Sequence, residues 1–205
     1  MTRSASLQAG APASRRLRWR LNANPASWSV PIVAEIGVAV ALAVVLSFVR
    51  LPWVMPQGGT VSLEMVPLIF LAVRRGVVPA LVAGFVYGML QLMLPGAFMF
   101  HPAQVALDYP LAFMAPAVAG FVNVTGWRSL WLAVGLGFGA RLVFHFLSGL
   151  IFFATYAPAW ESPWLYSITY NLLYLVPEAV LTVVVLWPLL KAYDAAFPQL
   201  RQPQV

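Results

Sequence analysis

Residues able to do chemistry are few in this chain, and four of them lie inside long apolar segments. Asp108 is about five positions into one such segment, and His145 is about sixteen positions into another. Asn171 lies near the start of a third segment, and Tyr87 about eleven positions into a fourth. A carboxylate surrounded by hydrocarbon is costly unless it meets a partner, so Asp108 is a candidate functional residue.

The types of these side chains indicate the chemistry of a ligand. A carboxylate accepts hydrogen bonds from an amino group, while histidine and amide side chains both donate and accept. Aromatic residues such as Tyr166 accompany them, and an aromatic face stabilises a cation by about 0.5–2 kcal/mol. The set therefore predicts a pocket for a planar, nitrogen-bearing, positively charged ligand.

Purely structural roles are the alternative for the same residues. Asp108 could form an internal ion pair with Arg141, which also lies within an apolar segment. His145 could donate a hydrogen bond to a carbonyl of a neighbouring helix. Taken singly, Tyr109 and Phe153 are also typical of membrane packing or of an interfacial aromatic belt.

Membrane helices are the elements that would position these residues. Hydrophobic residues make up 61% of the 205 positions, and charged residues only 9%. A soluble domain carries about 25% charged residues, because charge must cover its surface. A water-soluble fold is therefore excluded, and we predict an all-α integral membrane protein. The chain has no cysteine, which excludes disulfides, thiolate metal sites and cysteine nucleophiles.

Apolar segments separated by turn residues predict six transmembrane helices. A crossing needs about 20 apolar residues, and only the second segment is much shorter than this. The segments span Val30–Val49, Met65–Val73, Val77–Leu94, Ala103–Val124, Leu130–Ala154 and Tyr166–Leu190. They fall within one six-helix membrane domain at 29–192. We predict a disordered, basic cytosolic tail at 1–28 and a C-terminal cytosolic tail at 193–205.

The distribution of basic residues predicts the orientation in the membrane. With a cytosolic N-terminus, six crossings place ten of the twelve bases on the cytosolic side. Both termini are therefore predicted to be cytoplasmic, in a multi-pass protein of the bacterial plasma membrane. This topology explains the net charge of +6 without a nucleic-acid partner.

In this orientation, the polar residues within the apolar segments lie at a similar depth in the membrane. Asp108, His145, Tyr166 and Asn171 all fall in the outer half of their segments, so we predict a pocket that faces outward. Arg50 is the one base near that side, and an anionic ligand would need more than one.

Motifs for catalysis or for energy coupling are absent from the sequence. It contains no GxxxxGK[ST] phosphate loop, no HExxH metal pair and no GxSxG nucleophile elbow. We therefore predict a protein that is not an enzyme and that holds no cofactor or metal. In the first segment, Ala39 and Ala43 are four positions apart, and small residues at this spacing let another helix approach closely.

Several short sequences in a fixed order resemble the ThiT family, the thiamine-specific substrate-binding (S) components of energy-coupling-factor (ECF) transporters. They are MPQGGTVSLEMVPL, LAVRRG, LDYPLAF, HFLSGLIFF, YAP and YSITYN, and the similarity runs from about Ala34 to Leu190. The resemblance implies an S-component fold that captures thiamine from outside with high affinity. It also implies delivery by toppling in the lipid bilayer against a coupling transmembrane subunit, driven by two ATPase subunits.

The resemblance also implies roles for individual residues. Asp108 stands where the family has an acidic residue that pairs with the aminopyrimidine, and Tyr109 follows it. Tyr87 stands where an aromatic residue lines the pocket. Ala39 and Ala43 match the face that touches the coupling subunit. Other ligand positions of the family match in type and spacing at His145, Tyr166 and Asn171.

Two positions depart from the pattern of some family members. Phe153 replaces a tryptophan that stacks on the ligand, so stacking remains while the ring is a weaker partner for a cation. Asp108 is one methylene shorter than the glutamate of those members. A pyrimidine or thiazole precursor of thiamine is therefore an alternative ligand. The alternative functions are a stand-alone secondary transporter, for which the sequence shows no internal repeat, and a membrane enzyme of cofactor salvage.

Overall fold

The computed structural model describes residues 28–52 and 55–198, and its regular secondary structure there is helical. The helices are α2 (Val30–Leu46), α3 (Met65–Arg75), α4 (Val77–Gln91), α5 (Pro102–Ala106), α6 (Ala112–Met114), α7 (Trp127–Phe152) and α8 (Pro163–Ala196). Three further short helical elements complete the fold: η2 (Leu107–Leu111), η3 (Ala115–Phe121) and η4 (Ala154–Tyr156). Since α5, η2, α6 and η3 follow one another directly, they make one helical stretch, and the prediction of six helical segments is confirmed.

The segment bounds agree with the predicted ones to within a few residues, except at the C-terminus. There α8 continues past the predicted domain end at 192 and reaches Ala196. The tail predicted at 1–28 lies outside the described residues except for Trp28, and so do positions 199–205 of the predicted C-terminal tail.

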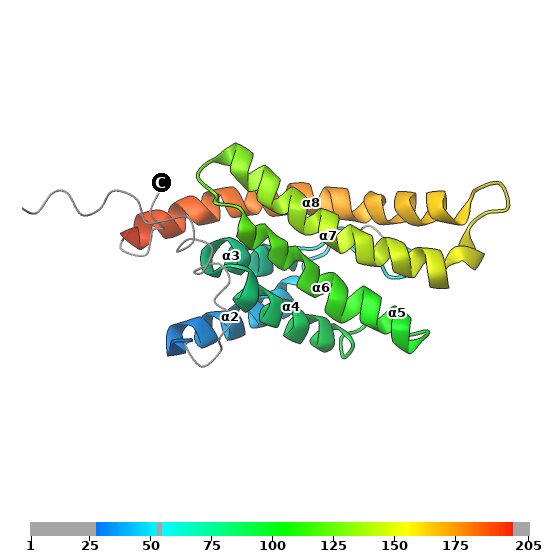
Figure 1. The fold of residues 1–205 in the computed structure, drawn as a ribbon, viewed down its shortest axis with the longest axis horizontal. Coiled ribbons are helices and arrows are strands. Elements are labelled where there is room, and N and C mark those ends of the chain that lie inside the picture. Colours follow the sequence, from blue (N-terminus) through cyan, green and yellow to red (C-terminus); the bar gives the residue numbers. More distant parts are fainter. Residues whose placement is uncertain (1–27, 53–54, 199–205) are drawn as a thin grey trace, which may run out of the picture.

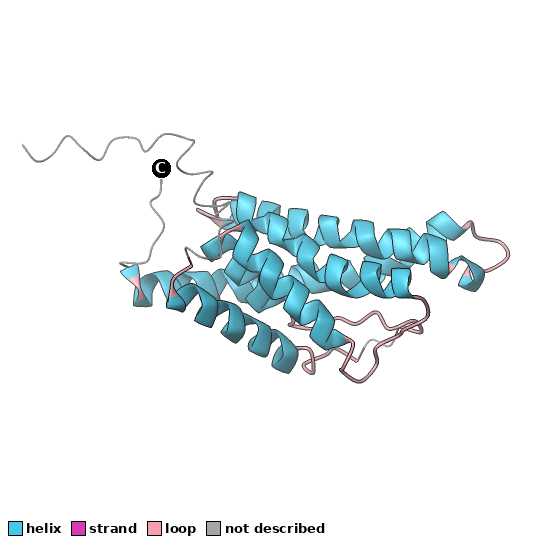
Figure 2. Cartoon of the chain, turned by 60° about the horizontal axis from the view of Figure 1, so that its bottom comes forward, coloured by secondary structure: helices cyan, strands magenta, loops and turns pink. Residues whose placement is uncertain are grey.

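The helices pack side by side as a bundle (Figures 1 and 2). The two longest helices, α7 and α8, lie against each other, and α2 lies on the other side of the bundle against α3 and α4. The stretch from α5 to η3 packs between α4 and α7. The elements that carry Asp108, His145 and Asn171 are therefore neighbours in space.

The surface of the bundle is suited to lipid. The helices α7 and α8 are long and apolar enough to cross a membrane, and α2 and α4 are shorter apolar helices. Large apolar side chains point outward along α2, among them Val33, Val38 and Val45, each more than half exposed. A soluble protein rarely exposes a continuous apolar surface of this kind.

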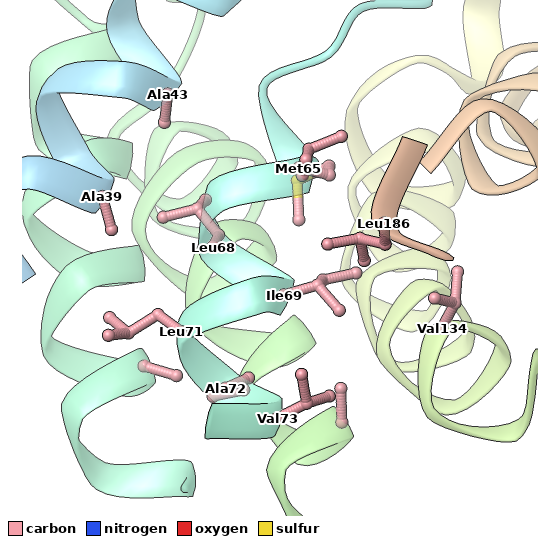
Figure 3. Packing of buried hydrophobic residues seen from close by; sticks show 14 of the residues in the cluster. Ala39, Ala43, Met65, Leu68, Ile69, Leu71, Ala72, Val73, Val134 and Leu186 are labelled. Atoms are coloured by element: carbon pink, nitrogen blue, oxygen red, sulfur yellow. The ribbon is translucent and has the colours of Figure 1, made fainter. Parts of the chain in front are cut away.

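Helix α3 forms the centre of the core (Figure 3). At 1.5 Å per residue its 11 residues span about 16 Å, roughly half of a 30 Å hydrocarbon layer. Most of its side chains are buried, including Met65 and Ile69, which are fully inaccessible. Because α3 is short, its N-terminal end lies inside the bundle and places Glu64 there, only 3% exposed.

The predicted role of Ala39 and Ala43 in binding a coupling subunit needs correction. These alanines are 6% and 0% exposed, and they point into the chain's own core beside Leu68 of α3 (Figure 3). Small residues at this spacing do permit a close helix contact, but the contact is with the chain's own helices. The outward face of α2 carries Val38 and Leu42 instead.

Two glycines of α4 position the segment that carries Asp108. A Cβ added to Gly88 would lie 2.7 Å from the carbonyl oxygen of Tyr109, and one added to Gly84 would overlap the carbonyl group of Phe113. Only glycine therefore lets α4 approach this segment so closely. The residues Leu107–Leu111 form a single π-helical turn around Pro110, which has no N–H to donate to the helix.

Candidate functional site

A pocket opens between the start of α8, the end of α7 and the Asp108 segment. Six of the seven predicted ligand residues line it: Asp108, Tyr109, His145, Phe153, Tyr166 and Asn171. Residues 57–60 and 95–98, from two loops, complete the wall. Polar groups from separate helices therefore meet in one pocket.

Asp108 is fixed by three side chains. Its Oδ2 accepts hydrogen bonds from Gln104 Nε2 and from Ser148 Oγ, each at 2.7 Å. Its Oδ1 lies 3.1 Å from His145 Nδ1. Gln104 precedes Asp108 by one helical turn, and Ser148 and His145 both lie on α7. The carboxylate thus has a set position on the pocket wall.

Aromatic rings form the wall beside Asp108. The hydroxyl of Tyr109 accepts from the backbone N–H of Phe98 at 2.6 Å and donates to the carbonyl of the same residue at 3.1 Å. The ring of Phe98 lies 5.6 Å from that of Phe153, centroid to centroid. These contacts hold the loop before α5 against the pocket, which Phe98, Tyr109 and Phe153 all line.

The polar face of α8 forms the opposite wall. Asn171 donates to the carbonyl of Ser167 and accepts from the hydroxyl of Tyr174, both at 2.8 Å. Tyr170 accepts from the backbone N–H of Gln57 at 3.0 Å, which holds the loop before α3 over the pocket. Four-residue spacing places these tyrosines on one face of the helix with Tyr166.

Tyr87 does not line the pocket, contrary to the prediction. Its side chain is fully buried behind Glu64, and its hydroxyl donates to Glu64 Oε2 at 2.8 Å. Gln91, one turn later on α4, donates to the same carboxylate oxygen at 3.1 Å and also bonds the tyrosine hydroxyl. Tyr87 therefore supports a pocket residue from behind.

The predicted alternative of an Asp108–Arg141 ion pair is wrong. Arg141 Nη1 lies 2.9 Å from Glu178 Oε2, and its Nη2 lies 3.4 Å from Glu64 Oε1. Its guanidinium also stacks over the ring of Phe113, 4.6 Å from the centroid. All three ionic side chains are at most 5% exposed, so they form a buried ionic cluster, named here the Arg141 cluster, in and behind the floor of the pocket.

The sequence contained part of the signal for this cluster. An intramembrane arginine requires an acidic partner, and Glu178 lies within an apolar segment. Their pairing across 37 positions is a property of helix packing, which residue spacing along one chain does not reveal. Glu64 directly precedes the predicted segment Met65–Val73, and the short length of α3 places it at pocket depth.

Basic residues lie at the other end of the bundle. Arg74 pairs with Asp194 at 2.8 Å, and Lys191 lies over the ring of Trp187. Arg75 forms a bidentate ion pair with Glu35. These residues lie at the end of α3, the start of α2 and the end of α8, whereas the pocket involves the opposite ends of α7 and α8.

Comparisons with known proteins agree on one family. Residues 33–198 match the family described as thiamine transporter protein (Thia_YuaJ). The thiamine transporter ThiT of Bacillus subtilis is 36% identical over 165 residues, covering 74% of this chain and 86% of that protein. ThiT of Lacticaseibacillus paracasei is 32% identical over 185 residues, covering 81% of this chain and 90% of that protein.

A solved structure has the same fold. The structure of ThiT from Listeria monocytogenes superimposes with a TM-score of 0.67 at 27% sequence identity, covering 83% of this chain and 97% of that chain. The six-segment bundle is therefore the fold of an S component, and the helices suited to lipid belong to an integral membrane protein. On these matches, the chain belongs to the thiamine transporter (Thia_YuaJ) family.

Proposed function

We propose that this chain is the thiamine-binding S component of an ECF-type importer, and that Asp108 is the residue that binds the aminopyrimidine of thiamine. The observation that carries the proposal is the position of Asp108: a carboxylate on the pocket wall whose three protein partners are Gln104, Ser148 and His145, with no lysine or arginine among them. A cation in the pocket would supply the missing counter-charge.

The charge around the pocket favours a cationic ligand. The charged residues that line the pocket are Asp108, Glu64, Arg141 and the exposed Arg50, while Glu178 lies behind the floor and pairs with Arg141. Arg141 is shared between Glu64 and Glu178, so it does not neutralise the carboxylate of Asp108. Thiamine carries a positive thiazolium ring and an amino group on its pyrimidine, so it matches both the charge and the donor requirement. Aromatic faces beside Asp108 would add about 0.5–2 kcal/mol each.

Uptake by this chain is proposed to depend on partner subunits. The sequence has no phosphate-binding loop, so a coupling transmembrane subunit and two ATPase subunits would supply the energy. The basic residues at the end of the bundle away from the pocket support an orientation with that end in the cytosol and the pocket toward the outside. In this mechanism the S component topples in the bilayer against the coupling subunit to release thiamine inside.

Reconstituted transport tests this proposal. Liposomes that contain the chain with a coupling subunit and ATPases should accumulate thiamine only when ATP is present. Liposomes with the chain alone should bind thiamine without accumulating it. Accumulation by the chain alone under an ion gradient would overturn the proposal in favour of a secondary transporter. A panel with thiamine phosphates and with the pyrimidine and thiazole precursors would define the substrate.

A further inference from the structure

We infer that Arg141 is a positioning residue for ligand binding: it fixes the tautomer of His145 and, through that ring, the orientation of Asp108. The inference rests on the proposed function, which makes Asp108 the carboxylate that binds the ligand. It assigns to Arg141 a role beyond its ion pairs with Glu64 and Glu178.

The hydrogen-bond chemistry of arginine determines the tautomer. Arg141 Nε lies 3.2 Å from His145 Nε2. A guanidinium can only donate, so His145 Nε2 must be the acceptor and carries no proton. The proton of the neutral imidazole is then on Nδ1. Since Nδ1 lies 3.1 Å from Asp108 Oδ1, the ring donates to the carboxylate.

The Arg141 cluster holds the donating edge in place. Glu178 and Glu64 bind the two terminal nitrogens of Arg141, and the ring of Phe113 lies under its guanidinium plane. These contacts leave the Nε–H edge directed at His145, one helical turn along α7. The glutamates therefore fix the direction of a hydrogen bond that ends on Asp108.

The tautomer matters because it determines how many hydrogen-bond acceptor sites of Asp108 remain for a ligand. An ionised carboxylate has about four acceptor sites, and Asp108 uses three of them on His145, Gln104 and Ser148. About one site remains, which suits a single ligand N–H. With the other tautomer, Nδ1 and Oδ1 would both be acceptors at 3.1 Å, and the carboxylate would turn away. His145 itself has both ring nitrogens occupied by protein groups, so its role is to orient Asp108.

Nitrogen NMR of the histidine rings tests the tautomer without any ligand. The chain has two histidines, and His101 is exposed, so ¹⁵N-histidine labelling gives two ring systems. The variant His101→Asn assigns the spectrum and keeps a side chain able to cap α5, where His101 accepts from the backbone N–H of Ala103. At neutral pH we expect His145 to carry its proton on Nδ1 alone. A proton on Nε2 would overturn the inference.

Substitution of Arg141 separates positioning from ion pairing. Arg141→Lys keeps a positive charge for the two glutamates but lacks the flat Nε–H edge. We expect a mixture of His145 tautomers and an approximately tenfold weaker thiamine affinity. Glu178→Gln is the matched control, because the glutamine amide oxygen can still accept from Arg141 Nη1 while the negative charge is lost, so it should leave the tautomer unchanged. Equal effects of both variants on the tautomer would show that Arg141 is only a member of the cluster.

Variants of His145 keep the inference testable if Arg141→Lys does not fold. Asparagine places an N–H near the position of Nδ1, whereas glutamine reaches toward that of Nε2. We expect His145→Asn to bind thiamine at least tenfold more tightly than His145→Gln. Equal affinities would contradict the positioning role. Absence of thiamine binding in a wild-type protein with the expected tautomer would count against the proposed function and leave the inferred hydrogen bonds intact.

Discussion

Arg141 Nη1 lies 2.9 Å from Glu178 Oε2, deep between α7 and α8. This ion pair affects the charge of the pocket, because it engages a buried guanidinium that could otherwise have neutralised Asp108. A carboxylate within an apolar protein that has no lysine or arginine partner is a candidate functional residue. The pairing thus leaves Asp108 free to bind a cationic ligand.

Removing the charge of Asp108 should weaken ligand binding. We expect Asp108→Asn to lower thiamine affinity at least about tenfold, or 1.4 kcal/mol, because the amide has no charge to pair with the ligand. Isothermal titration calorimetry measures the change. Glu35→Gln is the control, since Glu35 pairs with Arg75 at the other end of the bundle, and it should bind as the wild type does. Equal affinities of the two variants would remove Asp108 from the site.

The Arg141 cluster should make a large contribution to stability. Arg141→Met leaves Glu64 and Glu178 buried without their base, which typically costs about 3–5 kcal/mol. We expect a clear drop in the unfolding temperature, measured in one detergent for all variants. Adding Glu178→Gln to Arg141→Met should recover part of the loss, because it removes one of the stranded charges. An unchanged unfolding temperature for Arg141→Met would show that the cluster is dispensable.

The close approach of α4 to the Asp108 segment should require glycine. Gly88→Ala would place a methyl group 2.7 Å from the carbonyl oxygen of Tyr109, so one of the two segments must move. We expect both a lower unfolding temperature and weaker thiamine binding. Gly37→Ala is the matched control on α2, where an added Cβ meets no atom within 4 Å. If both variants behave alike, the contact does not position the site.

The ring of Phe153 should contribute to affinity through its face. Phe153 lines the pocket, whereas its neighbour Phe152 stacks on His101 outside it. An aromatic face over a cation is worth about 0.5–2 kcal/mol, so Phe153→Leu should weaken thiamine binding by about 2- to 30-fold. Phe152→Leu should have little effect in the same titration. The reverse order of effects would place the ligand elsewhere.

The sequence was sufficient to predict the helices and the depth of the polar residues. Apolar runs and turn residues located all six helical segments, because a segment inside the bilayer must form its backbone hydrogen bonds internally and therefore folds as a helix. Counting positions along these segments predicted that Asp108, His145 and Asn171 lie at a similar depth in the membrane. In the structure all three line one pocket.

The sequence pattern did not predict how each helix is rotated about its axis or which neighbouring helix each of its faces contacts. Tyr87 has the depth of a pocket residue, yet its side chain points to Glu64 behind the wall. The alanine spacing in α2 correctly indicated a close helix contact, but not that the contact is internal. Both outcomes depend on packing between segments far apart in the chain, which a periodic pattern within one segment does not specify.

Thiamine binding by the purified chain is the most direct test of the proposed function. A calorimetric titration of the protein alone, without coupling or ATPase subunits, should give saturable binding of one thiamine per chain, accompanied by a higher unfolding temperature. No binding heat together with no shift in the unfolding temperature would contradict the account.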